Sequence, residues 1–179
     1  MDNIEYREFN IDDEIQVLKA YKEILSSEHE YGYDKFSGAY CLKELSSIEF
    51  SEFLKHLEYL KTGHYEESSQ TFMWLFDENE LVGFGVIRWD DNYKTLNYQG
   101  HVGALVRPSK RGHRYAETIL RLSAKILFES GKESIIVSSK PKNVASYKTL
   151  EHGGMSFKNE YISNDGQKYL VYKMDNFVV

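Results

Sequence analysis

Cysteine and proline are scarce in this chain of 179 residues, and their scarcity excludes several kinds of protein. The single cysteine, Cys41, has no partner for an internal disulfide and cannot build a thiolate-rich zinc site. We therefore expect a reducing, cytoplasmic setting. Only two prolines, Pro108 and Pro141, interrupt the chain.

Long apolar runs and an excess of positive charge are lacking too. No run approaches the roughly 20 apolar residues that cross a bilayer, and the first ten residues show no secretory signal. Lysine and arginine number 22 against 28 acidic residues, a net charge of −6, so little positive charge is available to neutralise phosphates along a nucleic acid. We expect neither a membrane nor a nucleic-acid partner. Hydrophobic residues, at 41%, suffice for the core of one domain spanning residues 1–179.

The spacing of the apolar residues predicts the element order β-α-α-β-β-β-α-β-α-β-β, an α/β or α+β fold with a mixed sheet. Helices are expected at 12–27, capped by Asp12 or Asp13, and at 47–61, 114–130 and 144–152; strands are expected at 4–9, on both sides of a turn at 77–80, and at 100–106, 134–138, 155–162 and 168–174. The segment 100–138 reads as a β-α-β unit, so its two strands should be parallel and joined right-handed.

A basic turn opens the helix at 114–130. The first backbone N–H groups of a helix have no partner within it, and the helix dipole places partial positive charge there. Four cations crowd the same turn: Arg107, Lys110, Arg111 and Arg114. The segment therefore predicts a site for a phosphate or pyrophosphate. The alternative is an ordinary solvated basic turn.

Two motifs carry a family resemblance. Val106-Arg107-Pro108 precedes Arg111-Gly112-His113-Arg114-Tyr115-Ala116 at the opening of a helix, and Asn143-Val144-Ala145-Ser146 opens a second helix that leads to Gly153-Gly154. Together with the element order, these segments resemble the GNAT superfamily of acyl-CoA-dependent N-acyltransferases, and particularly a bacterial branch of predicted acetyltransferases with unassigned substrates. The resemblance implies a mixed, mostly antiparallel central sheet with helices on both faces.

The resemblance also implies acetyl-CoA as cofactor; no metal is expected, because the chain has a single cysteine and no paired histidines. Backbone of Ala104, Leu105 and Val106 would pair with the pantetheine arm like an added strand, and the Val106 N–H would point at the thioester carbonyl. The backbone N–H groups from Arg111 to Ala116 (Arg111, Gly112, His113, Arg114, Tyr115, Ala116) would hold the pyrophosphate. Asn143 and Ser146 would lie beside the pantetheine, although a helix N-cap is an equally good use of Asn143.

Two positions depart from the family pattern. The family usually has glycine where this chain has Arg114, and the arginine would need helical dihedral angles at the start of the helix. Its guanidinium would then either contact a phosphate or obstruct the site. The family's usual acid is a tyrosine seven residues after the second-motif asparagine, and that position here is Leu150.

The acid and base of the transfer therefore have to come from elsewhere. His101, on the strand that would bind the cofactor, has an ordinary pKa suited to a base; the alternative is a buried histidine with satisfied hydrogen bonds. Tyr147 is the candidate acid nearest to the usual position, and the sequence cannot rank it against Tyr161, Tyr169 and Tyr172. A thiolate is also a tolerable leaving group unaided, given the thiol reference pKa near 8.5.

The implied reaction is direct transfer of an acetyl group, in a ternary complex, to a primary amine of a small molecule or to an exposed amino group. The loops at 26–48, 62–70 and 90–99 should form the acceptor side. They carry tyrosines (Tyr31, Tyr33, Tyr40, Tyr65, Tyr93, Tyr98) and acids (Glu28, Glu30, Asp34, Glu66, Glu67, Asp90, Asp91) that would suit a cationic amine, unless they are ordinary surface residues.

The sequence fits other functions less well. Gly83-Phe84-Gly85 lacks the third glycine of a dinucleotide motif and lies within a strand pattern, and the six histidines show no H-x-x-x-H spacing for zinc. The stronger rival is a non-catalytic acyl-CoA-binding or sensor protein of the same fold. Homodimers are common in this fold, so a homodimer is a further expectation for this chain.

Overall fold

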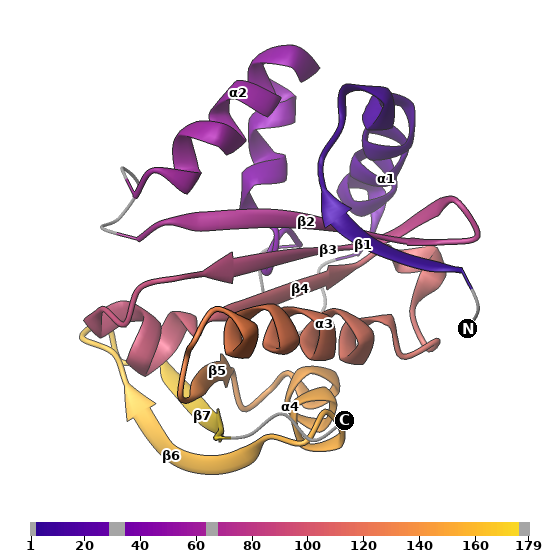
Figure 1. The fold of residues 1–179 in the computed structure, drawn as a ribbon. Helices are drawn as coiled ribbons and strands as arrows, with labels where there is room; N and C mark the ends of the chain where they lie inside the picture. Colours follow the sequence, from indigo (N-terminus) through magenta and orange to yellow (C-terminus); the bar gives the residue numbers. More distant parts are fainter. Residues whose placement is uncertain (1–2, 29–34, 64–67, 176–179) are drawn as a thin grey trace.

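A computed structural model describes residues 3–28, 35–63 and 68–175 of the chain (Figure 1). The strands are β1 (Ile4–Glu8), β2 (Gln70–Asp77), β3 (Glu80–Arg88), β4 (Val102–Val106), β5 (Ile135–Ser139), β6 (Ser156–Ile162) and β7 (Lys168–Met174). The helices are α1 (Glu14–Ser26), α2 (Phe50–Lys61), α3 (Tyr115–Glu129) and α4 (Val144–His152). Strands and α-helices follow one another in the predicted order.

The strands form two antiparallel sheets that meet at β4 and β5. The first sheet has the order β1-β2-β3-β4, and the second has the order β5-β7-β6. β4 and β5, the two strands of the predicted β-α-β unit, belong to different sheets. Just before β4, the His101 N–H donates to the Ile136 carbonyl at 2.6 Å, and beyond that point the two strands share no ladder. An unpaired edge of β4 therefore faces β5.

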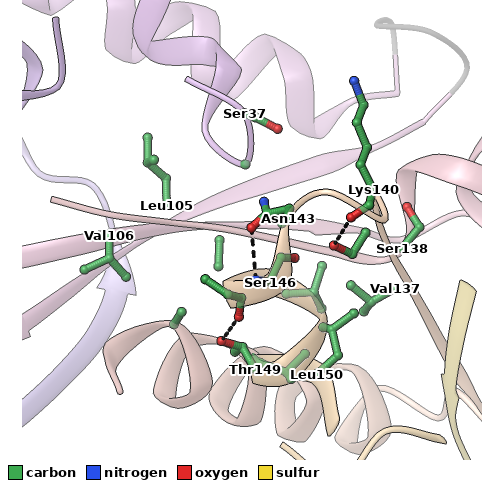
Figure 2. Close-up of a pocket in the computed structure, with 18 of the residues that line it drawn as sticks. Ser37, Leu105, Val106, Val137, Ser138, Lys140, Asn143, Ser146, Thr149 and Leu150 are labelled. Carbon is green, nitrogen blue, oxygen red and sulfur yellow. Dashed lines mark hydrogen bonds between the residues drawn. The ribbon is translucent and has the colours of Figure 1, made fainter. Parts of the chain in front are cut away.

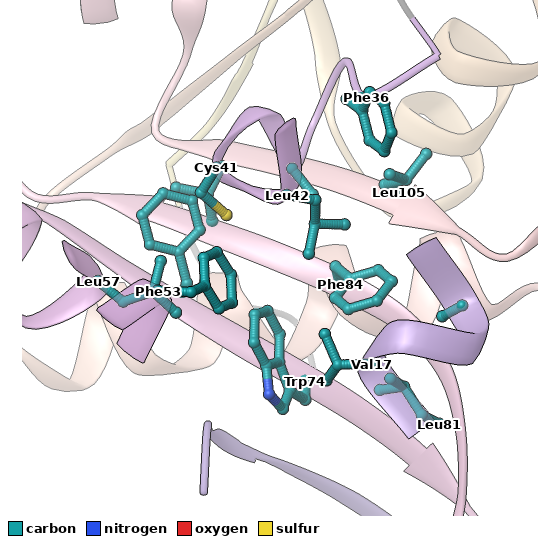
Figure 3. Close-up of a cluster of buried hydrophobic side chains, with 14 of the residues drawn as sticks. Val17, Phe36, Cys41, Leu42, Phe53, Leu57, Trp74, Leu81, Phe84 and Leu105 are labelled. Atoms are coloured by element: carbon teal, nitrogen blue, oxygen red, sulfur yellow. The ribbon is translucent and has the colours of Figure 1, made fainter. Parts of the chain in front are cut away.

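Helices cover both faces of the first sheet. α1 and α2 lie on one face and α3 on the other (Figure 1). The core under α1 and α2 is built around Trp74 of β2, whose ring meets that of Phe84 edge-on with centroids 5.0 Å apart (Figure 3). α3 buries the stripe Ile119, Leu120, Ser123, Ala124 and Leu127, as its helical spacing predicts. The predicted α/β class, mostly antiparallel with helices on both sides, is confirmed. The single mixed sheet expected here is instead divided into two antiparallel sheets, because β4 and β5 share no ladder.

Two local predictions need correction. Asp13 occupies the N-cap position of α1, but its side chain accepts no capping hydrogen bond from that helix. Asn10 instead caps the short 3-10 turn (Ile11–Asp13) that precedes α1. The buried Asp13 carboxylate instead accepts two hydrogen bonds from the Arg7 guanidinium at 2.8 Å. The segment 90–99, expected as a loop, contains a π-helix at Thr95–Gln99, which has no 3.6-residue apolar period to reveal it.

Within the described ranges, no helix combines the length and the apolar character that crossing a membrane requires.

Candidate active site

A cavity of about 820 Å³ lies where β4 and β5 separate (Figure 2). Its walls come from β4, β5, the turn before α3, the first turns of α4 and the loop after α1. The lining includes ten of the predicted cofactor-binding residues: Ala104, Leu105, Val106, Arg111, Gly112, Arg114, Tyr115, Ala116, Asn143 and Ser146. His113 does not line it; its ring stacks on Tyr115 with centroids 5.9 Å apart. The fold thus brings both sequence motifs to one cavity.

The free edge of β4 presents backbone donors to this cavity. The Arg107 N–H donates to the Val82 carbonyl of β3 at 3.0 Å. In an antiparallel pair the N–H groups of successive residues point alternately toward the partner strand and away from it, so this bond fixes the direction of the others. Leu105 and Gly103 therefore point their N–H groups toward β3, whereas Val106 and Ala104 point theirs to the opposite edge. That edge faces the cavity, as an added strand or an oxyanion donor requires.

The N-terminus of α3 lies open at one end of the cavity. Gly112, with φ of +83°, has no heavy atom within 4 Å of the place where a Cβ would lie. Arg114 precedes the helix with φ of 62° and ψ of 16°, in the left-handed region rather than the helical one predicted for it. Glycine adopts this region without cost and arginine does not. The Arg114 side chain is 72% exposed and lies 3.7 Å from Glu117.

Arg107 does not join the cluster of cations predicted at this turn. Its side chain is 3% exposed and donates to Glu23 of α1 at 2.7 and 3.0 Å and to the Leu81 carbonyl at 2.7 Å. Lys110 lines the cavity, but its ammonium group donates a hydrogen bond to the Glu80 carboxylate at 2.5 Å. The charge of the turn is therefore partly balanced by two carboxylates.

Asn143 serves as the N-cap of α4. Its Oδ1 accepts from the Ser146 N–H at 3.1 Å (Figure 2). The same residue lines the cavity, so the capping and cofactor interpretations are compatible. Leu150, 5% exposed, lies on the cavity wall at the position where the family usually has tyrosine.

Comparison with known proteins identifies the family. Residues 39–154 match the family model described as the acetyltransferase (GNAT) family. The chain belongs to this family. It is therefore an acyltransferase of the GNAT fold. No curated protein matches the sequence.

Solved structures share the GNAT fold at low sequence identity. RimL, a ribosomal L7/L12 α-N-protein acetyltransferase solved with coenzyme A, is 14% identical with a TM-score of 0.65; the match covers 98% of this chain and 95% of RimL. An N-acetyltransferase from Staphylococcus aureus Mu50 is 15% identical with a TM-score of 0.62, covering 97% and 99%. A spermidine N-acetyltransferase SpeG chimera from Vibrio cholerae and hSSAT is 13% identical with a TM-score of 0.61, covering 96% and 94%.

His101, the predicted base of this GNAT protein, lies outside the cavity lining. It is 1% exposed, and both ring nitrogens have partners: Nδ1 accepts from the Ile136 N–H at 2.9 Å, so Nε2 carries the proton and donates to Asp91 at 2.7 Å. Burial lowers the pKa of His101, the nearby Lys132 ammonium adds to the effect, and Asp91 opposes it. The ring holds the point where β4 and β5 begin to separate.

The tyrosines proposed as acids are distributed differently. Tyr147 lies outside the lining and packs against the buried cluster around Leu150. The Tyr172 hydroxyl donates to Glu151 at 3.1 Å, and Tyr161 also lies outside the lining. Tyr169 lines the cavity, and burial raises the pKa of its hydroxyl.

The acidic acceptor wall predicted for the GNAT site does not form from the described residues. Asp90 accepts from the Ser69 N–H at 2.6 Å, and Asp91 from His101 and Lys132. Glu28 is exposed and absent from the lining, and the other predicted residues lie outside the described part: Glu30, Tyr31, Tyr33, Asp34, Tyr65, Glu66 and Glu67.

Of the predicted tyrosines, Tyr40 and Tyr98 line the cavity, while Tyr93 is exposed. Among residues 3–28, 35–63 and 68–175, no aspartate or glutamate belongs to the lining, and no group of three metal-binding side chains occurs.

Gly38 is a site residue that the sequence did not reveal. A Cβ built on it would lie 2.3 Å from the Ala104 carbonyl oxygen, and its φ is +95°. Glycine is therefore needed for the loop after α1 to rest on the cavity edge of β4. The only sequence signal for this role was a glycine in an aromatic-rich segment. Its contact partner, Ala104, lies 66 residues later in the chain, so no local pattern could reveal the contact.

Proposed function

We propose that this GNAT protein transfers an acetyl group from acetyl-CoA to a primary amine by direct transfer in a ternary complex. The observation that carries the proposal is the joining of three features in one cavity: the unpaired edge of β4, the open N-terminus of α3 and the Asn143–Ser146 turn. An extended thioester with an anionic end group fits such a cavity.

The lining residues support this cofactor at its phosphates, its pantetheine arm and its thioester. The backbone N–H groups of the turn 112–116 would hold a phosphate, with Arg111 and Arg114 on the same wall, whereas the Arg111 N–H itself donates to the Pro108 carbonyl at 3.4 Å. Ala104 and Val106 would offer main-chain donors to an extended arm, and Asn143 also lines the cavity. Bound acetyl-CoA supplies the acetyl group as an activated thioester. The Val106 N–H would be the donor that stabilises negative charge on the thioester carbonyl oxygen.

The protons of the reaction can be carried by groups in or on the cavity. A primary ammonium group, with a reference pKa of about 10.4 as for lysine, must lose a proton before its nitrogen can attack. Because His101 is buried with both nitrogens bonded, we assign that proton to water in the cavity rather than to the histidine. With Leu150 in place of tyrosine, the thiolate departs unaided, or with a proton from Tyr169 on the cavity wall.

A thiol-release assay tests the proposal. Acetyl-CoA and a panel of primary amines are incubated with the protein, free CoA is followed, and each product is identified by mass spectrometry. Amine-dependent release of CoA with formation of the acetylamide supports the proposal.

The rival function gives a different result in the same experiment. A non-catalytic acyl-CoA-binding protein would bind acetyl-CoA, yet no amine would accelerate CoA release. That combination would refute transfer and favour the rival function.

A further inference from the structure

Four tyrosines gather at the end of the cavity beside the start of β4. Tyr98 lies on the π-helix, Tyr93 just before it, and Tyr161 and Tyr169 are directly opposite each other on β6 and β7. The Tyr98 ring stacks on Tyr161 with centroids 5.8 Å apart and planes 15° apart. Tyr98 and Tyr169 are 5.7 Å apart, and the Tyr93 and Tyr161 hydroxyls are 2.8 Å apart. We call these four residues the tyrosine cluster.

The cluster has an inner and an outer half. Tyr98 and Tyr169 line the cavity, whereas Tyr161, which stacks on Tyr98, and Tyr93 lie outside the lining. The backbone also holds Tyr98 in place, because the Ser138 hydroxyl on β5 donates to the Tyr98 carbonyl. Two aromatic rings of the cavity lining are thus held in place by their neighbours, near the start of β4, whereas the α3 turn follows the end of β4.

The acceptor enters at this end if the cofactor's phosphates lie at α3. Phosphates at the α3 turn place the thioester along β4, leaving the Tyr98 end for the second substrate. Among the described residues of this wall, Arg88 and Lys140 are the charged side chains. The other polar groups are tyrosine rings, hydroxyls and one amide. This wall is poorly suited to a polycation. Aromatic rings instead favour a flat aromatic group, which they bind by offset stacking or edge-to-face contact.

We infer that the acceptor is an amine attached to an aromatic ring, bound with its ring against Tyr98 and Tyr169. The inference rests on the proposed function and names the substrate class of the same site. Tyr98 and Tyr169 act as specificity-determining residues; Tyr161 is a positioning residue that acts through Tyr98.

Three amines separate the contributions of charge, size and aromaticity. 2-Phenylethylamine and 2-cyclohexylethylamine share charge and length but differ in the π-face, and spermidine represents a polyamine. We expect the kcat/KM for the phenyl compound to exceed that for the cyclohexyl compound by about three- to tenfold, the advantage of an aromatic pair beyond its buried area. Spermidine should be the poorest substrate.

Variants locate the preference. Tyr98→Ala should abolish the advantage of the phenyl over the cyclohexyl compound while leaving the KM for acetyl-CoA unchanged, and Tyr98→Phe should retain it. Tyr161→Leu should reduce the advantage without abolishing turnover. Tyr59→Ala, at an exposed tyrosine on α2, is the matched control and should change neither quantity.

Binding is measured as well, so that a failure of transfer is distinguishable from a failure of the inference. Saturation-transfer NMR of 2-phenylethylamine with the CoA-bound protein should show ring contact that Tyr98→Ala removes, whether or not the amine is acetylated. Absence of that contact, equal kcat/KM for the phenyl and cyclohexyl amines, or a preference for spermidine would each overturn the inference.

Discussion

The buried guanidinium of Arg107 is held by the carboxylate of Glu23, 84 residues earlier in the chain, at 2.7 and 3.0 Å. The other oxygen of Glu23 accepts from the Ser109 N–H at 2.6 Å. One carboxylate of α1 therefore fixes both the side chain and the backbone of the turn that leads to α3. Burial alone would raise the pKa of Glu23, but the bonds from Ser109 and Arg107 outweigh it and lower that pKa.

Replacing Glu23 by glutamine should loosen this turn. Glutamine has one acceptor oxygen and no charge, so it cannot serve both Arg107 and Ser109. We expect the free energy of unfolding to fall by roughly 1.5–3 kcal/mol, the range for hydrogen bonds to charged groups. Urea denaturation measures the loss, and acetyl-CoA should bind more weakly. The exposed Glu28→Gln is the control; equal effects of both substitutions would contradict the positioning role.

Replacing Arg114 by glycine should stabilise the protein. The residue has φ of 62°, a region that costs about 1–2 kcal/mol for a residue with a Cβ. Because glycine also gains freedom in the unfolded chain, the expected net gain is about 0.5–1 kcal/mol. Arg111→Gly, at φ of −68°, should instead be destabilising. Thermal denaturation of both variants checks the prediction, and a loss of stability in Arg114→Gly would refute it.

Replacing Gly38 by alanine should disturb the cavity edge of β4. The new Cβ would meet the Ala104 carbonyl oxygen at 2.3 Å. Gly131 is a matched control, since it has the same φ of +95° but no heavy atom within 4 Å of its Cβ position. We expect Gly131→Ala to cost about 1 kcal/mol and Gly38→Ala at least roughly 2 kcal/mol. Similar denaturation midpoints for the two variants would show that the close approach is unimportant.

Protonation of His101 should destabilise the fold. Its pKa is lowered in the folded protein, so the neutral form contributes stability that is fully present above the unfolded pKa of about 6.5 and is lost as the pH falls. Protonation would also convert Nδ1 from an acceptor into a donor facing the Ile136 N–H. Urea midpoints between pH 7.5 and 5.5 should fall for the wild type and for the exposed-site control His152→Gln. His101→Gln should lack this dependence; an unchanged slope would contradict the assignment.

Local patterns predict this molecule better than contacts between distant segments. α4 and β7 lie at their predicted residues because their apolar spacing and the turn residues around them are local. The inward turn of Arg107 depends on Glu23, and the burial of His101 depends on Asp91 and Ile136. No short-range pattern encodes these partners. The family resemblance located the cavity, but the tyrosine cluster depends on how β6, β7 and the π-helix meet.

Acetyl-CoA binding at the α3 turn is the central claim, and calorimetric titration of the wild type and Ala116→Glu tests it most directly. Ala116 lines the cavity in the first turn of α3, where a carboxylate would repel a phosphate yet favour the helix dipole. The account predicts micromolar binding to the wild type and none to the variant, whose melting temperature should not fall. No binding to the wild type, or equal binding to a stably folded Ala116→Glu, would contradict it.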